Sequence, residues 1–398
     1  MTPPHVLVSG ESIGGLSAAF WLARTGWQVT VLERAPSFRD GGQNVDVRGV
    51  GREVLDRMGL FETVKALNTT ETGTVLVGDD GRVRTELPSD DVDGSTAELE
   101  VLRGDLARAV RDALPDGVEI VHDDSIRAVE DHDDHVVVTT QQGRRYEVAL
   151  LVVAEGVRST TRDLVFSDVA DVHELGITMA FGTIERTATD DDTWRWYNAV
   201  GGRQVHLRPD PYGTTRAILA YADGGDLAGV GPDEARTSLR ERFADAGWEA
   251  PRVLDGFDRT DDLYVDDLAQ VRMPTWHRGR VCLLGDAGWC VTPIGGGGAT
   301  LALTAGYVLA ASLTHGTERA DLERDLEAYE QWLRPVVADV QRLPPGMDHF
   351  AFPRTRLGLA ARRVVDKAMT TPPLSRLAAR ATHVAQTDQE LPPLPSPR

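Results

Sequence analysis

The sequence is poor in cysteine and in basic residues, and it has no long apolar run. Its two cysteines, Cys282 and Cys290, cannot form a disulfide framework in a chain of 398 residues. The longest apolar stretch runs from Leu301 to Leu313, and a membrane-spanning helix needs about 20 residues. No charged-then-apolar leader precedes Val6, so we expect a cytoplasmic protein that does not enter a membrane.

Basic residues are outnumbered, with 42 Lys and Arg against 62 Asp and Glu and a formal net charge of −20. Nucleic acid is therefore not an expected partner, because a polyanion would be repelled at long range. The balance changes near the end of the chain, where residues 351–398 hold 8 basic and 3 acidic side chains. This segment is either a solvated helical face or a tail that docks on the acidic body.

The chain is long enough for two domains, and its residue patterns divide it. The first 35 residues predict a strand, a glycine turn, a helix and a strand, which form a βαβ unit. From about 165 to 262, alternating polar and aromatic residues predict an antiparallel sheet with a helix near 233–246. A buried-strand pattern returns at 279–284, so the second region is predicted to be an insertion into the first.

A dinucleotide-binding fingerprint occupies the first turn. Gly10, Gly14 and Gly15 lie between a predicted strand and helix, and Glu33 follows 23 residues after Gly10. The glycines would permit a tight turn and close packing, and the helix N-terminus would attract a pyrophosphate. Glu33 would accept hydrogen bonds from ribose hydroxyls. Ser12 stands where a second glycine is usual. A glycine-rich turn that binds no nucleotide is the alternative.

A second motif joins Gly285 and Asp286, at a predicted strand end, to the run Pro293 to Gly298 before a helix of small residues. A carboxylate at a strand end can hold sugar-like hydroxyls, and glycine N–H groups at a helix N-terminus favour an anion. Each feature alone is a weak signal. Their order after the first fingerprint makes them specific.

With these two motifs and the segment Ala154 to Ser159, most of the chain resembles the single-component FAD-dependent aromatic (group A) monooxygenases of the p-hydroxybenzoate hydroxylase fold. It is similar to tetracycline-inactivating monooxygenases and to actinobacterial polyketide oxygenases. The resemblance implies an α/β fold: a Rossmann-like FAD-binding domain, an inserted and mainly antiparallel β-sheet substrate domain, and a C-terminal helical segment. The implied FAD-binding pieces are 1–73, 99–165 and 265–335, with a substrate-domain hairpin at 74–98, the substrate domain at 166–264 and the helical segment at 336–398.

The resemblance also implies which residues bind the cofactor. Glu33 would bind the adenosine ribose, Arg103 the flavin phosphate or ribityl region, Asp286 the ribityl chain, and Gly295 to Gly298 the pyrimidine edge of the flavin. The predicted set for non-covalent FAD is Gly10, Ser12, Ile13, Gly14, Gly15, Glu33, Arg34, Arg48, Arg103, Gly285, Asp286, Pro293, Gly295, Gly296, Gly297, Gly298 and Ala299. No metal site is predicted.

Three residues depart from the family pattern: Glu155 stands in place of aspartate, Trp289 in place of histidine and Thr300 in place of asparagine. FAD binding is expected despite them. They put the reduction by NAD(P)H, or the hydroxylation itself, in question.

No catalytic side chain is predicted, because the flavin carries the difficult chemistry. Six residues are candidates to line an aromatic substrate pocket: Trp194, Trp196, Tyr197, His206, Arg208 and Tyr221. Alternation places Trp194 and Trp196 on one face of a strand. His206 and Arg208 also share a face and would steer a phenolate or carboxylate. For each candidate, packing of the sheet onto its helix is the alternative role.

The implied activity is NAD(P)H- and O2-dependent oxygenation of an aromatic or polyketide-type metabolite through a flavin C4a-hydroperoxide. One alternative is an FAD enzyme for a non-hydroxylating step in antibiotic biosynthesis, such as dehydrogenation, epoxidation or cofactor-scaffolded cyclisation. Another is a flavin-loaded protein that binds a metabolite without turnover. The sequence does not identify the substrate, the choice between NADH and NADPH, or the oligomeric state.

Overall fold

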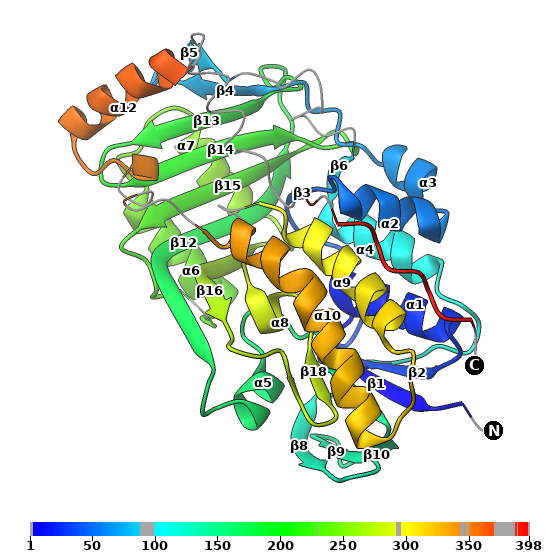
Figure 1. The fold of residues 1–398 in the computed structure, drawn as a ribbon. Helices are drawn as coiled ribbons and strands as arrows, with labels where there is room; N and C mark the ends of the chain where they lie inside the picture. The colour runs from blue at the N-terminus through cyan, green and yellow to red at the C-terminus, as the bar shows by residue number, and fades with distance from the viewer. Residues whose placement is uncertain are drawn as a thin grey trace.

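Two large sheets, one mainly parallel and one mainly antiparallel, organise the chain (Figure 1). The structure is a computed structural model that describes residues 3–87, 99–227, 229–291, 296–342, 346, 350–369, 387 and 389–396. Pro293, Gly295 and residues 88–98 of the predicted hairpin lie outside the described residues. This mixed α/β architecture agrees with the predicted fold class. The predicted domain boundaries stay predictions.

The mainly parallel sheet has the strand order β17-β18-β11-β1-β2-β7. Its strands are β1 (His5–Ser9), β2 (Gln28–Leu32), β7 (Glu119–Val121), β11 (Leu150–Val153), β17 (His277–Arg278) and β18 (Val281–Leu283). β1 pairs in parallel with β2 on one side and with β11 on the other, so the strand order reverses beside β1. In open parallel sheets, ligands bind at the carboxyl ends of the strands at such a reversal.

Helix α1 (Ile13–Arg24) connects β1 to β2, which confirms the predicted βαβ unit. Helix α9 (Gly298–Ser312) crosses α1 at Gly306, where an added Cβ would lie 2.5 Å from the backbone nitrogen of Ala18. Only glycine permits this close crossing. Ser17 reinforces the crossing by donating to the carbonyl oxygen of Leu303 at 2.7 Å. Helix packing therefore places the start of α9 near the turn that follows β1.

Smaller elements frame the two sheets. The two-stranded sheet is β3 (Asn44–Asp46) with β6 (Glu100–Leu102), and the three-stranded sheet is β8 (Ile126–Asp131), β9 (Val136–Thr140) and β10 (Arg145–Val148). The associated helices are α2 (Val50–Met58), α3 (Phe61–Lys65), α4 (Arg103–Asp112), α5 (Thr160–Val165), α8 (Asp286–Trp289) and α10 (Arg319–Val340). Gly59 ends α2 with a left-handed φ of 77°, as its position in the sequence predicts.

The mainly antiparallel sheet has the order β16-β12-β15-β14-β13-β4-β5. Its strands are β4 (Thr74–Val77), β5 (Val83–Glu86), β12 (Asp171–Glu185), β13 (Trp194–Ala199), β14 (Arg203–Pro209), β15 (Thr214–Ala222) and β16 (Tyr264–Arg272). β4 joins this sheet by pairing in parallel with β13. The early hairpin and the later inserted region therefore form one sheet.

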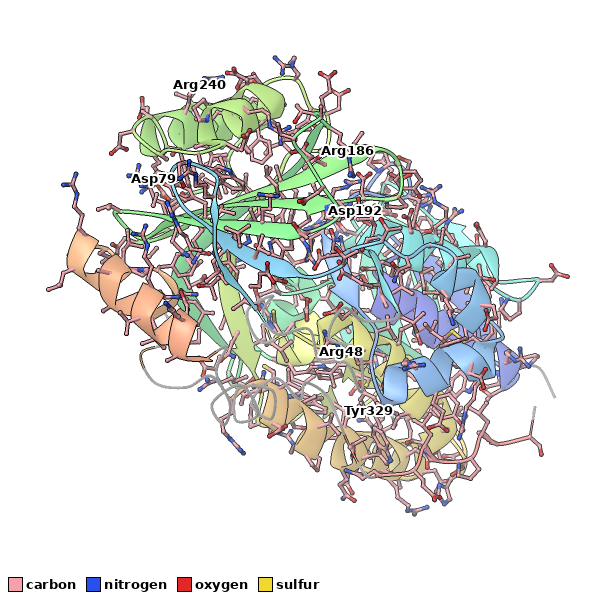
Figure 2. All side chains as sticks on the ribbon, turned by 90° about the horizontal axis from the view of Figure 1, so that it is seen from above. Arg48, Asp79, Arg186, Asp192, Arg240 and Tyr329 are labelled. Atoms are coloured by element: carbon pink, nitrogen blue, oxygen red, sulfur yellow. The ribbon has the colours of Figure 1, made fainter. Side chains whose placement is uncertain are left out.

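The two faces of this sheet have different coverings. Helices α6 (Pro232–Arg242) and α7 (Ala250–Phe257) cover one face and share a core with Val205, Leu219 and Tyr221. Helix α12 (Arg356–Met369) lies over the other face (Figure 1). There, Arg362 stacks on the ring of Trp196. Figure 2 shows Asp79 and Arg240 on the side that α6 and α7 cover, and Arg48 on the opposite side.

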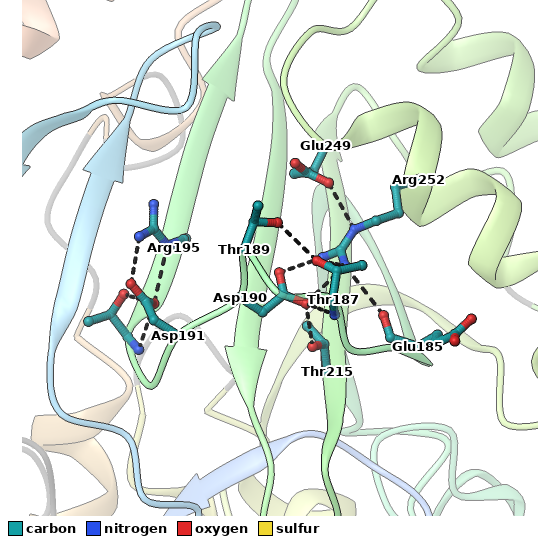
Figure 3. A network of polar contacts seen from close by, with 10 residues as sticks. Glu185, Thr187, Thr189, Asp190, Asp191, Arg195, Thr215, Glu249 and Arg252 are labelled. Carbon is teal, nitrogen blue, oxygen red and sulfur yellow. Dashed lines mark hydrogen bonds and ion pairs between the residues drawn. The ribbon is translucent and has the colours of Figure 1, made fainter.

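A network of charged side chains fastens the connection between β12 and β13 to α7 (Figure 3). Arg252 donates to both carboxylate oxygens of Asp190, at 2.9 and 2.8 Å. Thr215 of β15 donates to the same carboxylate at 3.0 Å. Next to it, Arg195 forms an ion pair with Asp191 at 2.6 Å. Asp190 therefore joins three segments, and this connection belongs to the scaffold.

The end of the described chain is a strap rather than a helix. Residues 389–396 are extended and run along α9 and α10, where Trp332 Nε1 donates to the carbonyl of Glu390 at 3.2 Å and the Tyr307 hydroxyl donates to that of Pro392 at 2.8 Å. The predicted helical segment at 336–398 thus holds the end of α10 and α12, but its last described part differs. The prolines at 392, 393 and 395 cannot continue a helix.

Candidate cofactor and substrate site

The turn after β1 has no room for side chains at two of its glycines. Gly10 has a φ of +114°, and an added Cβ would lie 2.3 Å from the carbonyl oxygen of Ala154. An added Cβ at Gly15 would lie 1.9 Å from the carbonyl oxygen of Gly10. Ile13 and Gly14 are buried at the start of α1, and Gly14 packs on Leu284. The turn therefore presents the N-terminal N–H groups of α1 at the strand reversal.

Glu33 lies directly after β2 and is nearly buried, with 9% of its surface exposed. Its two carboxylate oxygens accept hydrogen bonds from the backbone nitrogens of Glu11 and Ala35, both at 2.9 Å. These bonds fix the carboxylate at the edge of the glycine turn, where it retains lone pairs for a further donor. Arg34 is exposed beside it.

Arg103 is held against the glycine turn from the start of α4. Its Nη2 atom donates to Ser12 Oγ at 2.9 Å, and its backbone nitrogen donates to the carbonyl of Gln43 at 3.0 Å. Gly104 permits this approach, because a Cβ there would lie 1.6 Å from the carbonyl oxygen of Asp40. The guanidinium is therefore fixed where an anionic cofactor group would lie.

Asp286 is exposed, although Gly285 before it and Ala287 after it are buried. Surrounding protein raises the pKa of its carboxyl group, and the nearby Arg103 guanidinium opposes that increase. Arg103 thus lies between the first glycine turn and the strand-end carboxylate. Gly296 and Gly297 have left-handed φ values of 66° and 72° immediately before α9, and Gly298 and Ala299 form its first turn.

Arg48 and Thr300 join the loop after β3 to the first turn of α9. The backbone nitrogen of Arg48 donates to Thr300 Oγ1 at 3.0 Å, and its guanidinium donates to Asp46 at 3.0 Å. Gly51 permits the contact, since a Cβ there would lie 3.1 Å from the Cα of Thr300. Thr300, one of the three departures from the family pattern, therefore fastens this loop.

The other two departures also have structural roles. Glu155 accepts hydrogen bonds from the hydroxyls of Ser9, Ser159 and Thr161 at 2.6, 2.7 and 2.6 Å, and from the backbone nitrogen of Thr161 at 3.0 Å. It holds the loop after β11 to the start of α5. Trp289 is buried, with its ring 4.3 Å from that of Trp276, so its side chain packs the core.

The predicted pocket residues divide between the two faces of the antiparallel sheet. Tyr197 and Tyr221 are buried in the core under α6 and α7, where Tyr197 donates to Asp79 at 2.6 Å and Tyr221 to Asp226 at 3.0 Å. They do not share a face with the other candidates, because the strands place them at odd spacings from Trp194 and His206. Packing of the sheet onto its helices is their role.

The opposite side, which we call the aromatic face, carries a row of side chains that are cross-strand neighbours. The row runs across β16, β12, β15, β14 and β13 as Tyr264, Phe181, Ile218, His206 and Trp196. The ring of Trp194 stacks on that of Trp196 at 5.6 Å with an interplanar angle of 11°. Phe181 and Ile218 in this row are buried against Phe352. The rings of Tyr264, Trp194 and Trp196 are therefore the partly exposed part of this side of the sheet.

His206 is buried on the aromatic face, and burial lowers the pKa of its imidazole to about 3. Trp194 Nε1 donates to its Nδ1 at 3.2 Å, and its Nε2 lies 3.1 Å from Gln204 Oε1. Nε2 of the neutral ring must therefore carry the proton. His206 orients Trp194 and carries no charge that could steer an anion.

Arg208 is held between two carboxylates that the sequence analysis did not identify. Its Nε donates to Glu71 at 2.9 Å and its Nη2 to Glu100 at 2.6 Å. Its guanidinium also stacks on Trp194, 4.1 Å from the ring centroid. Burial and the charge of Glu100 raise the pKa of Glu71 to about 7, although Arg208 opposes the shift. Glu71 and Glu100 come from distant chain segments, so only the tertiary fold reveals the pairing.

Asp266 is a further unpredicted residue on the aromatic face, where it is the cross-strand neighbour of Met179. Burial raises the pKa of its carboxyl group to about 6; the charge of Asp286 adds to the shift and that of Arg158 opposes it. Helix α8, which begins at Asp286, packs against β16, so the strand of Asp266 lies next to the element that carries Asp286. Strand alternation from Tyr264 was the signal in the sequence that could have identified it.

The FAD binding domain family model matches residues 4–343 of this chain. The chain is 33% identical over 391 residues to the flavin-dependent monooxygenase eupH of Phoma sp, with 90% of each chain covered. It belongs to the family of FAD-dependent monooxygenases. The crystal structure of the tetracycline destructase Tet(51) matches it with a TM-score of 0.79 and 26% identity over 99% of both chains. The structure of Klebsiella pneumoniae HpxO complexed with FAD and uric acid shares the fold, with a TM-score of 0.76 and 20% identity over 96% of both chains.

The geometry of the monooxygenase fits FAD. Gly10 and Gly15 leave space that a side chain would fill, Glu33 and Asp286 follow the carboxyl ends of β2 and β18 in the same sheet, and Arg103 contacts Ser12 in the glycine turn. No helix in the described ranges is long and apolar enough to cross a bilayer. Within the same ranges, no group of three or more His, Cys, Asp or Glu side chains is arranged to hold a metal ion.

Proposed function

We propose that this monooxygenase uses NAD(P)H and O2 to hydroxylate or otherwise oxygenate an aromatic or polyketide-type small molecule in the cytoplasm. The turn from Gly10 to Gly15, together with Glu33, Arg103 and Asp286, forms what we call the cofactor cradle. The observation that carries the proposal is the position of the aromatic face beside this cradle. Helix α8, which begins at Asp286 of the cradle, packs against β16, the strand of Asp266, and Arg208 donates to Glu100, which precedes Arg103 in the chain by three residues. A bound aromatic molecule would therefore lie next to the flavin.

The residues of the cradle divide the cofactor between them. The turn at Gly10 to Gly15 and the N-terminus of α1 would hold the pyrophosphate, and Glu33 the adenosine ribose. Arg103 and Asp286 would hold the phosphate and ribityl region. Gly296 to Gly298, with Ala299 and the loop of Arg48, would hold the flavin ring, as Pro293 and Gly295 are also predicted to do. FAD supplies the redox chemistry with oxygen when it is bound.

The protein's own contribution is placement and the exclusion of water. Phe181 and Ile218 are buried on the aromatic face, and the stacked rings of Trp194 and Trp196 continue that surface. A site of this kind holds the ring of the substrate and keeps water away from the reacting carbon. Glu155 and Trp289 have structural contacts, so the residues that motivated a non-hydroxylating alternative do not favour it.

Purified protein tests this proposal directly. FAD-loaded enzyme should oxidise NAD(P)H with matching O2 uptake, and a panel of aromatic polyketides should contain a compound that stimulates both. Mass spectrometry with 18O2 should then show one labelled oxygen atom in the product. Failure to retain FAD would contradict the proposal, and turnover without O2 and NAD(P)H would replace it with the non-hydroxylating alternative.

A further inference from the structure

Building on the proposed function, we infer that the substrate of the aromatic face is an uncharged or positively charged planar polycycle, and that the face rejects anionic aromatic compounds. The geometry points to this selectivity because Arg208, Arg216 and Arg362 are each already paired with a carboxylate. The face instead offers stacking surfaces and an excess of acidic groups.

Arg208 is the cation nearest the stacked tryptophans, and two carboxylates bind it. Glu71 and Glu100 accept from different atoms of the guanidinium at 2.9 and 2.6 Å, and both carboxylates are almost fully buried. The N–H edges of the guanidinium bind the two carboxylates, and its flat face stacks on the Trp194 ring. A substrate carboxylate would have to approach the Glu100 carboxylate and the Glu71 carboxyl group, whose pKa is raised to about 7, to reach one positive charge. The predicted role of Arg208 in steering a phenolate or carboxylate is therefore not supported.

Arg216 and Arg362 are neutralised in the same way. Arg216, the cross-strand neighbour of Arg208, pairs with Asp210 and Asp262, both at 3.1 Å. Arg362 of α12 pairs with Asp366 at 3.2 Å and donates to the carbonyl of Ala351 at 2.7 Å. Both arginines hold parts of the protein together.

Acidic groups exceed these cations around the aromatic face. Asp46 lies beside Arg48 and Glu100, and Asp266 forms no ion pair within 4.0 Å in the described part of the chain. Like charges a few ångströms apart repel strongly where little water is present. The negative potential at this face therefore opposes an anion and tolerates a cation.

The remaining surface suits a neutral ring system. The row from Tyr264 to Trp196 crosses five strands and consists of aromatic, aliphatic and uncharged imidazole side chains. Offset stacking on such a row has no requirement for substrate charge. Ring shape, rather than an anchoring anion, would select the ligand.

Calorimetric titration of the FAD-loaded protein with two matched probes tests the inference. The probes are 1,8-dihydroxyanthraquinone and the same ring bearing one carboxylate. We expect the neutral probe to bind at least roughly tenfold more tightly, as expected for one uncompensated charge near the acidic groups. Glu71→Gln and Glu100→Gln each remove one charge beside Arg208, and each should narrow that ratio by about fivefold or more.

Glu323→Gln is the control, because it removes one negative charge from an exposed position on α10. It should leave the ratio of the two affinities unchanged. Equal or tighter binding of the carboxylate by the unaltered protein would overturn the inference. So would a ratio that neither Glu71→Gln nor Glu100→Gln changes, in variants that retain FAD absorbance and far-ultraviolet circular dichroism.

The titration measures binding and does not depend on turnover. The charge selectivity and the proposed oxygenase activity can therefore be contradicted independently of each other. Selective binding of the neutral probe without NAD(P)H oxidation by any substrate would support the inference and contradict the proposed function. Binding of neither probe would overturn the inference, and the measurement of O2 uptake would still decide the function.

Discussion

Arg103 and Ser12 connect the start of α4 to the first turn of the cofactor cradle, with the arginine donating to the serine hydroxyl at 2.9 Å. Ser12 is the N-cap residue of α1, yet its side chain makes no capping hydrogen bond. The hydroxyl orients the arginine instead. Because Arg103 also opposes the raised pKa of Asp286, one guanidinium joins the two glycine motifs. Ser12, which stands where the fingerprint usually has a glycine, therefore orients Arg103.

Ser12→Ala should weaken FAD binding by roughly 5- to 30-fold, the effect of losing a hydrogen bond worth about 1–2 kcal/mol. Flavin fluorescence during titration of the apoprotein measures the change. Arg103→Ala should weaken binding further, and adding Ser12→Ala to it should then have little effect. Fully additive effects in this double-mutant cycle would show that the serine does not act through the arginine.

Asp286→Ala should reduce FAD retention while the fold stays intact, because the side chain is exposed between buried neighbours. The ratio of flavin to protein absorbance in purified protein measures retention, and circular dichroism reports the fold. Asp255→Ala, on the exposed side of α7, is a matched control. Full FAD occupancy in Asp286→Ala would contradict the assignment.

The local signals of the sequence predicted the helices and strands that carry the cradle residues. Glycines at fixed offsets, buried strand patterns and the acidic residue after β2 are short-range features, and each lies in the expected element. The ends of helices α1 and α2 were also predictable, since Gly26 and Gly59 adopt the left-handed conformation that ends a helix.

Long-range features were not predictable from one sequence. Alternation placed Trp194 and Trp196 on one face, but it could not say which face the helices cover, so Tyr197 and Tyr221 were grouped with them. The pairing of Arg208 with Glu71 and Glu100 spans 137 and 108 residues. Such contacts depend on strand register between distant segments. The departures at Glu155, Trp289 and Thr300 also required the fold before their roles became clear.

Glu155→Ala should lower the free energy of unfolding by about 2–4 kcal/mol, because Ser9, Ser159 and Thr161 would lose a shared acceptor at a partly buried position. Chemical denaturation of the FAD-free protein measures the loss without the contribution of the cofactor. Glu155→Asp should recover part of it, since the shorter side chain retains the charge. A loss below about 0.5 kcal/mol would contradict the anchoring role.

His206 should make the protein sensitive to acid. Its folded-state pKa of about 3 lies below the ordinary histidine value of 6.5, so only the unfolded state gains this proton as the pH falls from about 7 to about 5. The stability contributed by the neutral ring is present above the unfolded pKa and falls below it, by about 2 kcal/mol at pH 5. Denaturation across this range should show a smaller decline in His206→Asn than in the unaltered protein. An identical decline would exclude His206 as the source.

Glu71 should act in the opposite direction. Its pKa is raised to about 7 in the folded protein, above the ordinary glutamate value of 4.5, so folding disfavours its charged form. The destabilisation is absent at a pH below the unfolded value and complete above the folded value. Glu71→Gln resembles the protonated group, so the variant avoids this destabilisation. The melting temperature of the variant should therefore rise relative to that of the unaltered protein as the pH increases from 5 to 8. Thermal denaturation at several pH values measures this difference, and Glu323→Gln on the exposed side of α10 should show no such trend. A difference for Glu71→Gln that stays constant with pH would contradict the raised pKa and the electrostatic strain that causes it.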